Sequence, residues 1–306
     1  MRPKSSVPVF LFIALMISLS IIFRANNDAP ATTTPAPQNT SGNTFSKIEA
    51  IKLPEKIAFA NEQAPLTSFD VRERLDRELL VNTYWHSNTL QLFKLASRHF
   101  PAIEKILKEQ GVPEDFKYLA LAESGLRNVI SPSDAAGFWQ FLESAGKEHG
   151  LEVNNVVDER YNIELSTLAA CKYLKKSHEE FGSWTLAAAS YNIGKNRLRK
   201  IIGEQKVDSY YDLFMNDETS RYVFRVLALK EIISNPKKYG FYLDKADYYE
   251  PLQTRAVTVN EDIEDLAAFA IQYGTNYKTL KLLNPWMRQP YLKVKKGKSY
   301  SVQLPV

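Results

Sequence analysis

A glutamate on the apolar side of an expected helix is the first residue in this chain that could do acid–base chemistry. The face that carries it follows the spacing i, i+3, i+4 and i+7: Phe116, Leu119, Ala120 and then Glu123. A carboxylate buried there without a partner is costly, so its pKa rises and it holds a proton. A carboxylic acid that is protonated near neutral pH can protonate the oxygen of a leaving group. Periodicity alone leaves another interpretation open, in which Glu123 ends the helix before Gly125 and reaches solvent.

Three polar motifs follow Glu123 along the chain. They are Ser131 with Gly137-Phe138-Trp139-Gln140, then Ser190-Tyr191-Asn192, and a later segment that ends at Tyr222. Each has an ordinary structural explanation when it is taken singly: a loop glycine, a pair of core aromatics, or a helix end closed by an Asn-x-Gly stop. Their order behind a candidate acid is what makes the set informative.

In this order the motifs resemble the catalytic domain of the soluble lytic transglycosylases, which has a goose-type lysozyme-like fold. The chain is similar to the membrane-bound lytic murein transglycosylase D group of that family. The resemblance covers roughly residues 70–247 and is sharpest from 113 to 200. The departures are small: Trp139 stands where many relatives have Met, and Ser190 stands where Ala is usual.

The family's functional residues can be carried over one by one. Its catalytic Glu-Ser pair matches Glu123-Ser124, and its Gly-x-x-Gln motif matches Gly137 to Gln140. The resemblance therefore implies that Glu123 is the single catalytic acid and base. It also implies a set of substrate-binding residues: Ser131, Gln140, Tyr191, Asn192 and Tyr222.

The reaction implied by the resemblance is non-hydrolytic cleavage of peptidoglycan glycan strands. The β-1,4 bond between N-acetylmuramic acid and N-acetylglucosamine would break, and the muramoyl 6-hydroxyl would close a 1,6-anhydro ring. Glu123 would protonate the leaving oxygen and then deprotonate that hydroxyl. Most glycosidases need two carboxylates, whereas these motifs contain one, so the substrate's own acetamido group would assist in place of the second.

Two other functions remain open from the residues. A goose-type lysozyme-like hydrolase becomes feasible if Asp134 faces the same cleft at about 6.5–9.5 Å from Glu123. A non-catalytic, peptidoglycan-binding envelope protein is the other alternative. The presence of Glu123, Gln140 and Tyr191-Asn192 together argues against that last function, because an inactive copy is expected to lose its acid first.

The elements that must position these residues are helices. Hydrophobic spacing from 70 to about 235 is helical almost throughout, and no alternating run is long enough for a sheet. Asp70 with Glu73 fits a capped helix start, and Pro113 fits the first position of the helix that carries Glu123. We therefore expect a mainly α fold class, with a lysozyme-like helical catalytic domain at 70–250.

A smaller unit follows at 251–306. Expected strands at 255–259 and 299–304 flank two expected helices at 261–273 and 276–283. This β-α-α-β order resembles a LysM module, a domain that binds glycans containing N-acetylglucosamine. The stretch 286–298, with four lysines and Arg288, departs from the compact LysM pattern. The module could bind glycan, or it could be a cap that packs on the catalytic domain without binding sugar.

The first residues carry a targeting pattern. Arg2 and Lys4 precede an apolar stretch from 7 to 23, and Arg24 closes it. We expect a signal-anchor or signal peptide at 1–24 and a Thr/Pro/Ala/Ser-rich linker at 25–69. The protein is then exported to the cell envelope, anchored in the inner membrane and facing the periplasm, or secreted if the segment is cleaved.

The composition limits the kinds of partner that the protein is expected to bind. The net charge is +4, and acidic residues are interspersed among the basic ones, so no polybasic stripe indicates a nucleic-acid partner. A single cysteine, Cys171, rules out an internal disulfide, and the four histidines lack the paired spacing of a metal site. We expect no metal and no cofactor. The expected partners are peptidoglycan glycan strands and, through the N-terminal segment, a membrane.

Overall fold

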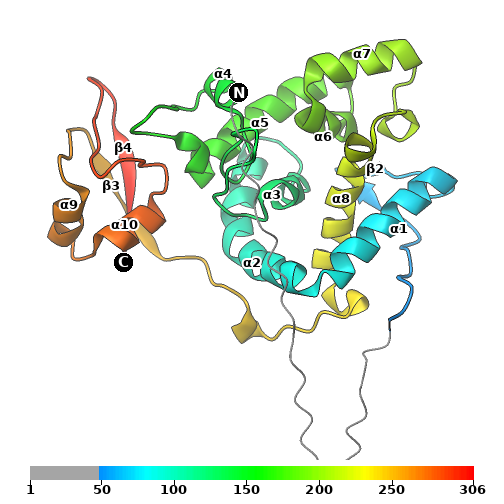
Figure 1. Cartoon of the computed structure of the whole chain (residues 1–306), viewed down its shortest axis with the longest axis horizontal. Coiled ribbons are helices and arrows are strands. Elements are labelled where there is room, and N and C mark those ends of the chain that lie inside the picture. The colour runs from blue at the N-terminus through cyan, green and yellow to red at the C-terminus, as the bar shows by residue number, and fades with distance from the viewer. Residues whose placement is uncertain (1–47) are drawn as a thin grey trace, which may run out of the picture. The chain divides into compact units, whose positions relative to one another are not determined.

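The computed structural model describes residues 48–306 (Figure 1). The expected signal-anchor or signal peptide at 1–24 and the first part of the expected linker lie outside the described residues. Residues 49–306 belong to one compact unit. Within the described part of the chain, no helix combines the length and the apolar composition that crossing a membrane requires.

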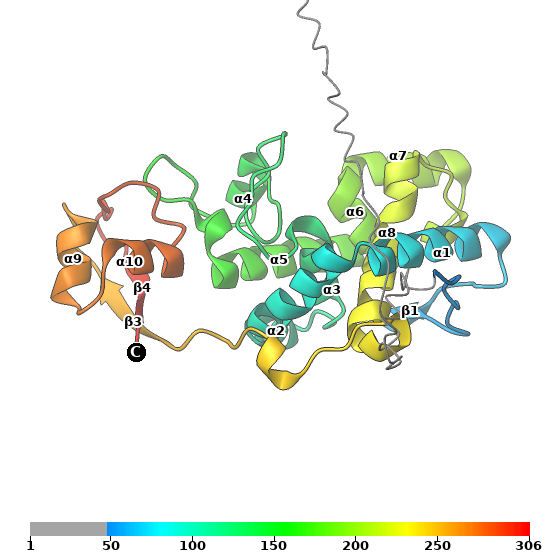
Figure 2. The same ribbon diagram turned by 60° about the horizontal axis from the view of Figure 1, so that its bottom comes forward.

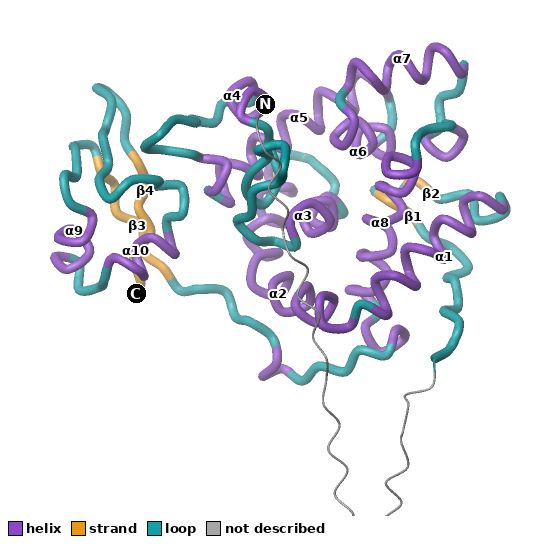
Figure 3. Tube along the Cα trace, in the orientation of Figure 1, coloured by secondary structure: helices purple, strands orange, loops and turns teal. Residues whose placement is uncertain are grey.

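Helices build most of this unit, which confirms the mainly α expectation (Figure 3). The α-helices between residues 69 and 234 are α1 Phe69–Tyr84, α2 His86–Glu109, α3 Phe116–Ser124, α4 Glu143–Glu148, α5 Ile163–Phe181, α6 Trp184–Ile193, α7 Lys195–Gln205 and α8 Asp217–Ser234. Four short 3-10 helices connect them or follow them: η1 Glu159–Tyr161, η2 Tyr210–Asp212, η3 Pro236–Tyr239 and η4 Lys245–Asp247.

The short helix α3 lies inside a ring of longer helices (Figures 1 and 2). It packs against α2 and α8, while α1 packs on α8 and α5 packs on both α2 and α6. Phe116, Leu119 and Leu121 of α3 are fully buried in the resulting core. A helix surrounded in this way holds its own position rigidly, because every neighbour presents an apolar stripe toward it.

Two helix starts differ from the sequence expectation. The helix α3 begins at Phe116, and the Asp115 carboxylate before it does not cap the helix: it accepts hydrogen bonds at 2.6 Å from the amide of Ala60 and from Lys230 Nζ. The helix α1 has Ser68 at its N-cap position, and Asp70 forms an ion pair with Arg74 instead of capping. Partners distant in the chain therefore occupy the Asp115 carboxylate.

The expected linker at 25–69 is wrong over its last part. Strands β1 Ala58–Phe59 and β2 Glu62–Gln63 form a short antiparallel hairpin. Phe59 is fully buried and lies edge-on to the ring of Phe116, with 4.9 Å between the centroids. The Glu62 carboxylate accepts the backbone amides of Trp184 and Thr185 at the N-terminus of α6. A charged helix cap and a buried ring make this segment part of the folded domain.

Replacing Phe59 by Ala is expected to lower the free energy of unfolding by about 3–4 kcal/mol, because the change empties a fully buried aromatic site next to α3. Urea unfolding followed by circular dichroism measures the effect. Phe69→Ala is the matched control, since that ring is 76 % exposed, and its cost should stay below about 0.5 kcal/mol. Equal midpoints for the two variants would show that the hairpin does not belong to the core.

The C-terminal module has the β-α-α-β order that we expected. Strand β3 Thr254–Val259, helices α9 Leu266–Gln272 and α10 Tyr277–Leu283, and strand β4 Tyr300–Pro305 follow one another. The strands pair antiparallel over their whole length, from Thr254 opposite Pro305 to Val259 opposite Tyr300. Leu266, Leu280 and Val302 are fully buried beneath this sheet.

The module packs directly on the helical domain through the stretch 286–298. The amide of Asp158 donates to the carbonyl of Trp286 at 2.9 Å, and the amide of Arg288 donates to the carbonyl of Val156 at 2.8 Å. The Arg288 guanidinium lies over the ring of Tyr161, 4.2 Å from its centroid.

The apolar core of the module also includes side chains from outside it. Ala136, Val157 and Tyr161 belong to the same buried cluster as Met287. Ala136 lies in the segment directly before Gly137, so the module touches the loop that carries the Gly-x-x-Gln motif. This is the packing that the cap interpretation predicts.

Candidate active site

The last turn of α3 carries Glu123 to the wall of a cavity of about 490 Å³. Glu123 is partly exposed there, whereas its neighbours Leu119 and Ala120 are fully buried. The cavity is formed by α1, the start of α2, the end of α3 and α8. Its lining residues are Glu78, Val81, Asn82, Trp85, Asn88, Leu92, Leu121, Ala122, Glu123, Ser124, Gly125, Arg127, Val129, Arg221, Arg225 and Leu229.

Tyr222 of α8 is the direct partner of this carboxyl group. Its Oη donates a hydrogen bond to Glu123 Oε1 at 2.5 Å. Burial raises the pKa of Glu123 to about 7, against the Tyr222 hydrogen bond and the charge of Arg225, which both lower it. Burial also raises the pKa of Tyr222 well above its usual value, so the phenol remains a donor at neutral pH. Glu123 is therefore able to change between acid and carboxylate near pH 7.

The loop after α3 is tied to the end of the helix. Gly125 ends α3 in the left-handed conformation, with φ +60°. Ser124 is buried, and its Oγ donates to the carbonyl of Phe138 at 2.8 Å. Tyr191 of α6 donates from Oη to the carbonyl of Trp139 at 2.7 Å. Two side chains from different helices thus hold the backbone of the Gly-x-x-Gln motif beside Glu123.

Gln140 stabilises the same loop from inside. Its Nε2 donates to the carbonyl of Gly137 at 2.8 Å and to that of Val129 at 3.1 Å. Gln140 itself has φ +48°, an uncommon conformation for a residue other than glycine. The amide therefore fixes the turn of the loop, and only its oxygen is left for another partner.

Gly137 and Arg160 meet at the base of this loop. Gly137 has φ +79°, and a Cβ at this position would lie 1.9 Å from the carbonyl oxygen of Arg160. The Arg160 guanidinium donates to the carbonyls of Asp134 and Phe141 and pairs with the Asp158 carboxylate. Only glycine allows the two backbones to approach this closely.

Two protein families match this chain. Residues 100–214 match the family described as the transglycosylase SLT domain, and residues 255–306 match the soluble lytic transglycosylase C-terminal LysM-like domain. The chain carries an SLT domain followed by a LysM-like module. Glu123, Gln140 and Tyr191 lie within the matched SLT residues, whereas Tyr222 on α8 lies after them.

The chain is also similar to curated proteins. It is 30 % identical over 220 residues to "Membrane-bound lytic murein transglycosylase D" of Escherichia coli K12, and the same values hold for that protein of an O6:H1 strain. The match covers 70 % of this chain and 47 % of each relative. A "Putative tributyltin chloride resistance protein" of Alteromonas is 26 % identical over 102 residues, 33 % of this chain and 49 % of that protein. The chain thus spans about half the length of the curated relatives it matches.

The five expected substrate-binding residues make different contacts in the structure. Tyr222 contacts Glu123, and Tyr191 and Gln140 bond the Gly-x-x-Gln loop behind it. None of the five expected substrate-binding residues is among the cavity-lining residues. Ser131 Oγ accepts the backbone amides of Ser133 and Ala135 in its own turn. Asn192 is half-buried at the end of α6, and no hydrogen bond joins its side chain to another described residue.

Burial shows that the two aromatic residues of the motif, Phe138 and Trp139, pack inside the protein. Trp139 is fully buried, and its Nε1 donates to Thr167 Oγ1 at 2.9 Å, so it belongs to the core of the SLT domain. Phe138 is also buried and packs edge-on to His99. Neither ring lines the Glu123 cavity.

The sequence analysis missed several cavity residues. Arg221 and Arg225, one residue before and three residues after Tyr222, share a face of α8, and Glu78 reaches the cavity from α1. Trp85 stands 58 % exposed at the junction of α1 and α2. The i, i+4 spacing of the two arginines was the only local signal, because the partner Glu78 lies 143 residues from Arg221 in the chain.

Other carboxylates near the motif do not line the cavity. Asp134 is exposed, has φ +61° and contributes its backbone carbonyl to Arg160. Glu143 is exposed and pairs with Lys147, and Glu148 is exposed. Glu78 is the second carboxylate on the cavity wall, and it is held in an ion pair with Arg221.

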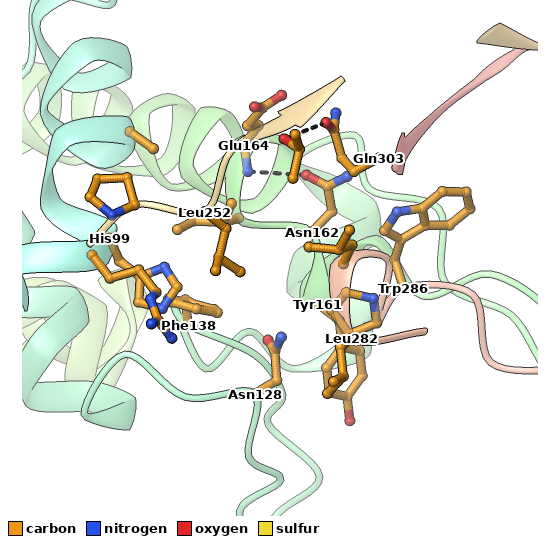
Figure 4. A pocket seen from close by; sticks show the side chains of 17 residues that line it. His99, Asn128, Phe138, Tyr161, Asn162, Glu164, Leu252, Leu282, Trp286 and Gln303 are labelled. Atoms are coloured by element: carbon orange, nitrogen blue, oxygen red, sulfur yellow. Dashed lines mark hydrogen bonds between the residues drawn. The ribbon is translucent and has the colours of Figure 1, made fainter. Parts of the chain in front are cut away.

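A second pocket, of about 260 Å³, lies where the LysM-like module meets the SLT domain (Figure 4). Phe138 and His99 form one side of it, Trp286 and Leu282 the other. Burial and the charge of Arg98 lower the pKa of His99 to about 4, so this imidazole is neutral. The pocket is mainly apolar and is separated from Glu123 by the loop through residues 125–129.

Proposed function

We propose that this protein is a peptidoglycan lytic transglycosylase. It cleaves the β-1,4 bond between N-acetylmuramic acid and N-acetylglucosamine without water and leaves 1,6-anhydro-muramoyl ends. The observation that carries the proposal is the Tyr222–Glu123 contact in an open cavity beside the SLT domain's Gly-x-x-Gln loop, with the pKa of Glu123 raised to about 7. The curated relatives named murein transglycosylase support the substrate and the location in the cell envelope.

In the first half of the reaction Glu123 is the acid. Its protonated carboxyl donates to the glycosidic oxygen, and the bond to the muramoyl anomeric carbon breaks as that oxygen becomes a hydroxyl. The acetamido oxygen of the substrate stabilises the positive charge that develops at the anomeric carbon. A pKa near 7 keeps a large fraction of Glu123 protonated at neutral pH.

In the second half Glu123 is the base. Its carboxylate takes the proton of the muramoyl 6-hydroxyl, whose oxygen bonds to the anomeric carbon of the same sugar. The acid form is thereby restored, and no water is consumed. The Tyr222 hydroxyl stabilises the carboxylate before it takes that proton, because it donates a hydrogen bond to Oε1.

The remaining motif residues position the loop or contact the substrate during these proton transfers. Tyr191 and Gln140 position the loop, and the unbonded amide of Asn192 is available to the acetamido group of the substrate. Ser131 shapes the turn at the start of the loop. The exposed ring of Trp85 offers an apolar face on which a sugar can stack.

Product analysis tests the proposal against the lysozyme-like alternative. Purified protein is incubated with peptidoglycan sacculi, and the released fragments are identified by mass spectrometry. Anhydro-ended fragments, which weigh one water less than their reducing counterparts, are the expected result. Reducing ends would instead support hydrolysis with Glu78 as the second carboxylate of the cavity.

Replacing Tyr222 by Phe is expected to lower the turnover rate roughly tenfold and to shift the pH dependence. Activity requires protonated Glu123, so it is present below a pKa of about 7 and is lost above it. The Tyr222 hydrogen bond lowers that pKa, so its removal raises the pKa and moves the fall in kcat/KM to higher pH. Rates of fragment release between pH 5 and 9 measure the shift.

Tyr239→Phe is the control for this prediction. Its hydroxyl donates to the Glu231 carboxylate at 2.9 Å, so the change removes a similar tyrosine–glutamate bond away from the cavity. Its pH profile should match that of the unmodified protein. An unchanged profile for Tyr222→Phe would mean that the phenol does not control the protonation of Glu123.

A further inference from the structure

Three arginines and two glutamates share the wall of the Glu123 cavity. Glu78 is almost completely buried, and Arg221 Nε lies 2.6 Å from its Oε1. Arg225 Nε lies 3.7 Å from Glu78 Oε2, which is too long for a hydrogen bond. The helices that carry these residues, α1 and α8, lie side by side (Figures 1 and 2). Arg225 is therefore the looser ion-pair partner of Glu78, and Arg221 also pairs with Asp217 at 3.5 Å.

Arg127 and Arg225 are the two arginines of this cavity wall that make no hydrogen bond to a carboxylate among the described residues. Within residues 48–306 Arg127 is exposed and forms no ion pair, and the side chain of Arg225 is 36 % exposed. Glu218 is close enough to raise the pKa of Glu123 but does not line the cavity. When Glu123 is protonated, the three arginines and Glu78 therefore leave the wall with a net charge of +2.

A neutral sugar chain does not require such charges. N-acetylglucosamine has no ionisable group, whereas the 3-O-lactyl group of N-acetylmuramic acid ends in a carboxyl. That carboxyl is either free or joined to a stem peptide that brings carboxylates of its own. The guanidinium group is the side chain best suited to carboxylates, because its N–H donors form a planar fork.

We infer that Arg127 and Arg225 bind a carboxylate carried by the muramoyl residue that Glu123 cleaves, and that they select muramoyl glycans over uncharged ones. The inference rests on the proposed function, because it assigns the substrate feature that the same cavity recognises. It assigns both arginines to substrate binding rather than to the proton transfers.

The placement of Arg225 has a consequence for catalysis. Its charge lowers the pKa of Glu123 in the free protein. A carboxylate bound to Arg225 offsets that charge, so the pKa of Glu123 rises when a muramoyl substrate is in place. A charged substrate then keeps a larger fraction of Glu123 in the acid form at neutral pH than an uncharged one does.

The test uses Arg225→Gln and Arg127→Gln with four substrates. They are sacculi, strands stripped of their peptides by an amidase, and each of these after carbodiimide amidation, which neutralises the carboxylates. All rates are measured at pH 5.5, where Glu123 is protonated with or without the charge of Arg225. We expect kcat/KM of each variant to fall about tenfold on the charged substrates and to equal that of the unmodified protein on the amidated ones. The unmodified protein itself should lose about tenfold on amidation.

Arg72→Gln is the matched control, because Arg72 lies exposed on α1 and does not line the cavity. A loss confined to sacculi identifies the stem peptide as the source of the carboxylate, and a loss on stripped strands identifies the lactyl group. An equal loss on charged and amidated substrates, or no loss in the unmodified protein on amidation, overturns the inference. Absence of anhydro-ended products from the unmodified protein overturns the proposed function instead.

Discussion

Replacing Glu123 by Gln is expected to reduce the release of anhydro-ended fragments from sacculi by about 10³-fold or more. The change removes the only carboxyl group that α3 contributes to the cavity, and it removes the base of the second step as well. General acid–base catalysis by one group contributes about 10²–10⁴-fold, and here the same group performs both transfers. Gln is close to Glu in size and can still accept the Tyr222 hydrogen bond, so the cavity keeps its shape.

The measurement is the initial rate of fragment release, read by mass spectrometry at pH 6, where Glu123 is mostly protonated. Glu148→Gln is the matched control, since Glu148 is exposed and outside the cavity, and it should retain full activity. If Glu123→Gln digests sacculi as fast as the unmodified protein does, the assignment of the acid is wrong.

A measurement of unfolding distinguishes a loss of catalysis from a loss of folded structure in Glu123→Gln. The pKa of Glu123 is about 7 in the folded chain and near 4.5 in the unfolded one. The folded state therefore retains a proton that the unfolded state loses, and the unmodified protein loses stability as the pH rises from about 4.5 through 7. Glu123→Gln lacks this loss. It should unfold at an equal or higher urea concentration at pH 8.

Gly137→Ala is the second change for which we expect a large effect, a loss of about 3 kcal/mol or more in the free energy of unfolding. The new Cβ would lie 1.9 Å from a backbone oxygen of Arg160, and backbone cannot move aside as a flexible side chain does. The positive φ of Gly137 adds strain of its own. The loop must shift, and this moves the Phe138 carbonyl away from Ser124 Oγ, which it holds next to Glu123.

Activity should fall with the fold in this case. A displacement of about 1 Å at a reacting group costs on the order of 10²-fold in rate, and it should appear even at temperatures where the variant is folded. Gly182→Ala is the matched control, because Gly182 has φ +70° with no atom within 4 Å of a new Cβ. It should cost roughly 1 kcal/mol and leave the rate unchanged. Equal effects of the two changes would contradict the role of the close approach to Arg160.

Local pattern was sufficient for several features of this protein. The position of Glu123 on the apolar face of α3 follows from helical spacing, and the β-α-α-β order of 251–306 follows from the change of period after Pro251. These features depend on neighbours within about one or two turns of helix or strand. The order of the motifs then indicated the family, and the matched SLT and LysM-like regions confirm that resemblance.

Short polar segments were harder to interpret. The hairpin at 58–63 follows a stretch whose composition is typical of linkers, and its burial depends on Phe116 and on the N-terminus of α6. Gln140 has the residue type of a substrate ligand, yet its Nε2 is used by carbonyls of its own loop. A residue type shows which hydrogen bonds its side chain can form, but it does not show which partner forms them.

By itself the sequence predicted a candidate acid, the helix that carries it, the family and the order of the SLT and LysM-like regions, because each of these is encoded by residues close together in the chain. Only the tertiary structure decided what surrounds the acid. Tyr222 reaches Glu123 across 99 residues, Arg221 reaches Glu78 across 143, and the C-terminal module supports the loop before Gly137 through Met287. The pKa of Glu123 and the surplus charge of its cavity arise from such distant contacts, since burial and Coulomb interactions depend on distance in space and not on separation in sequence.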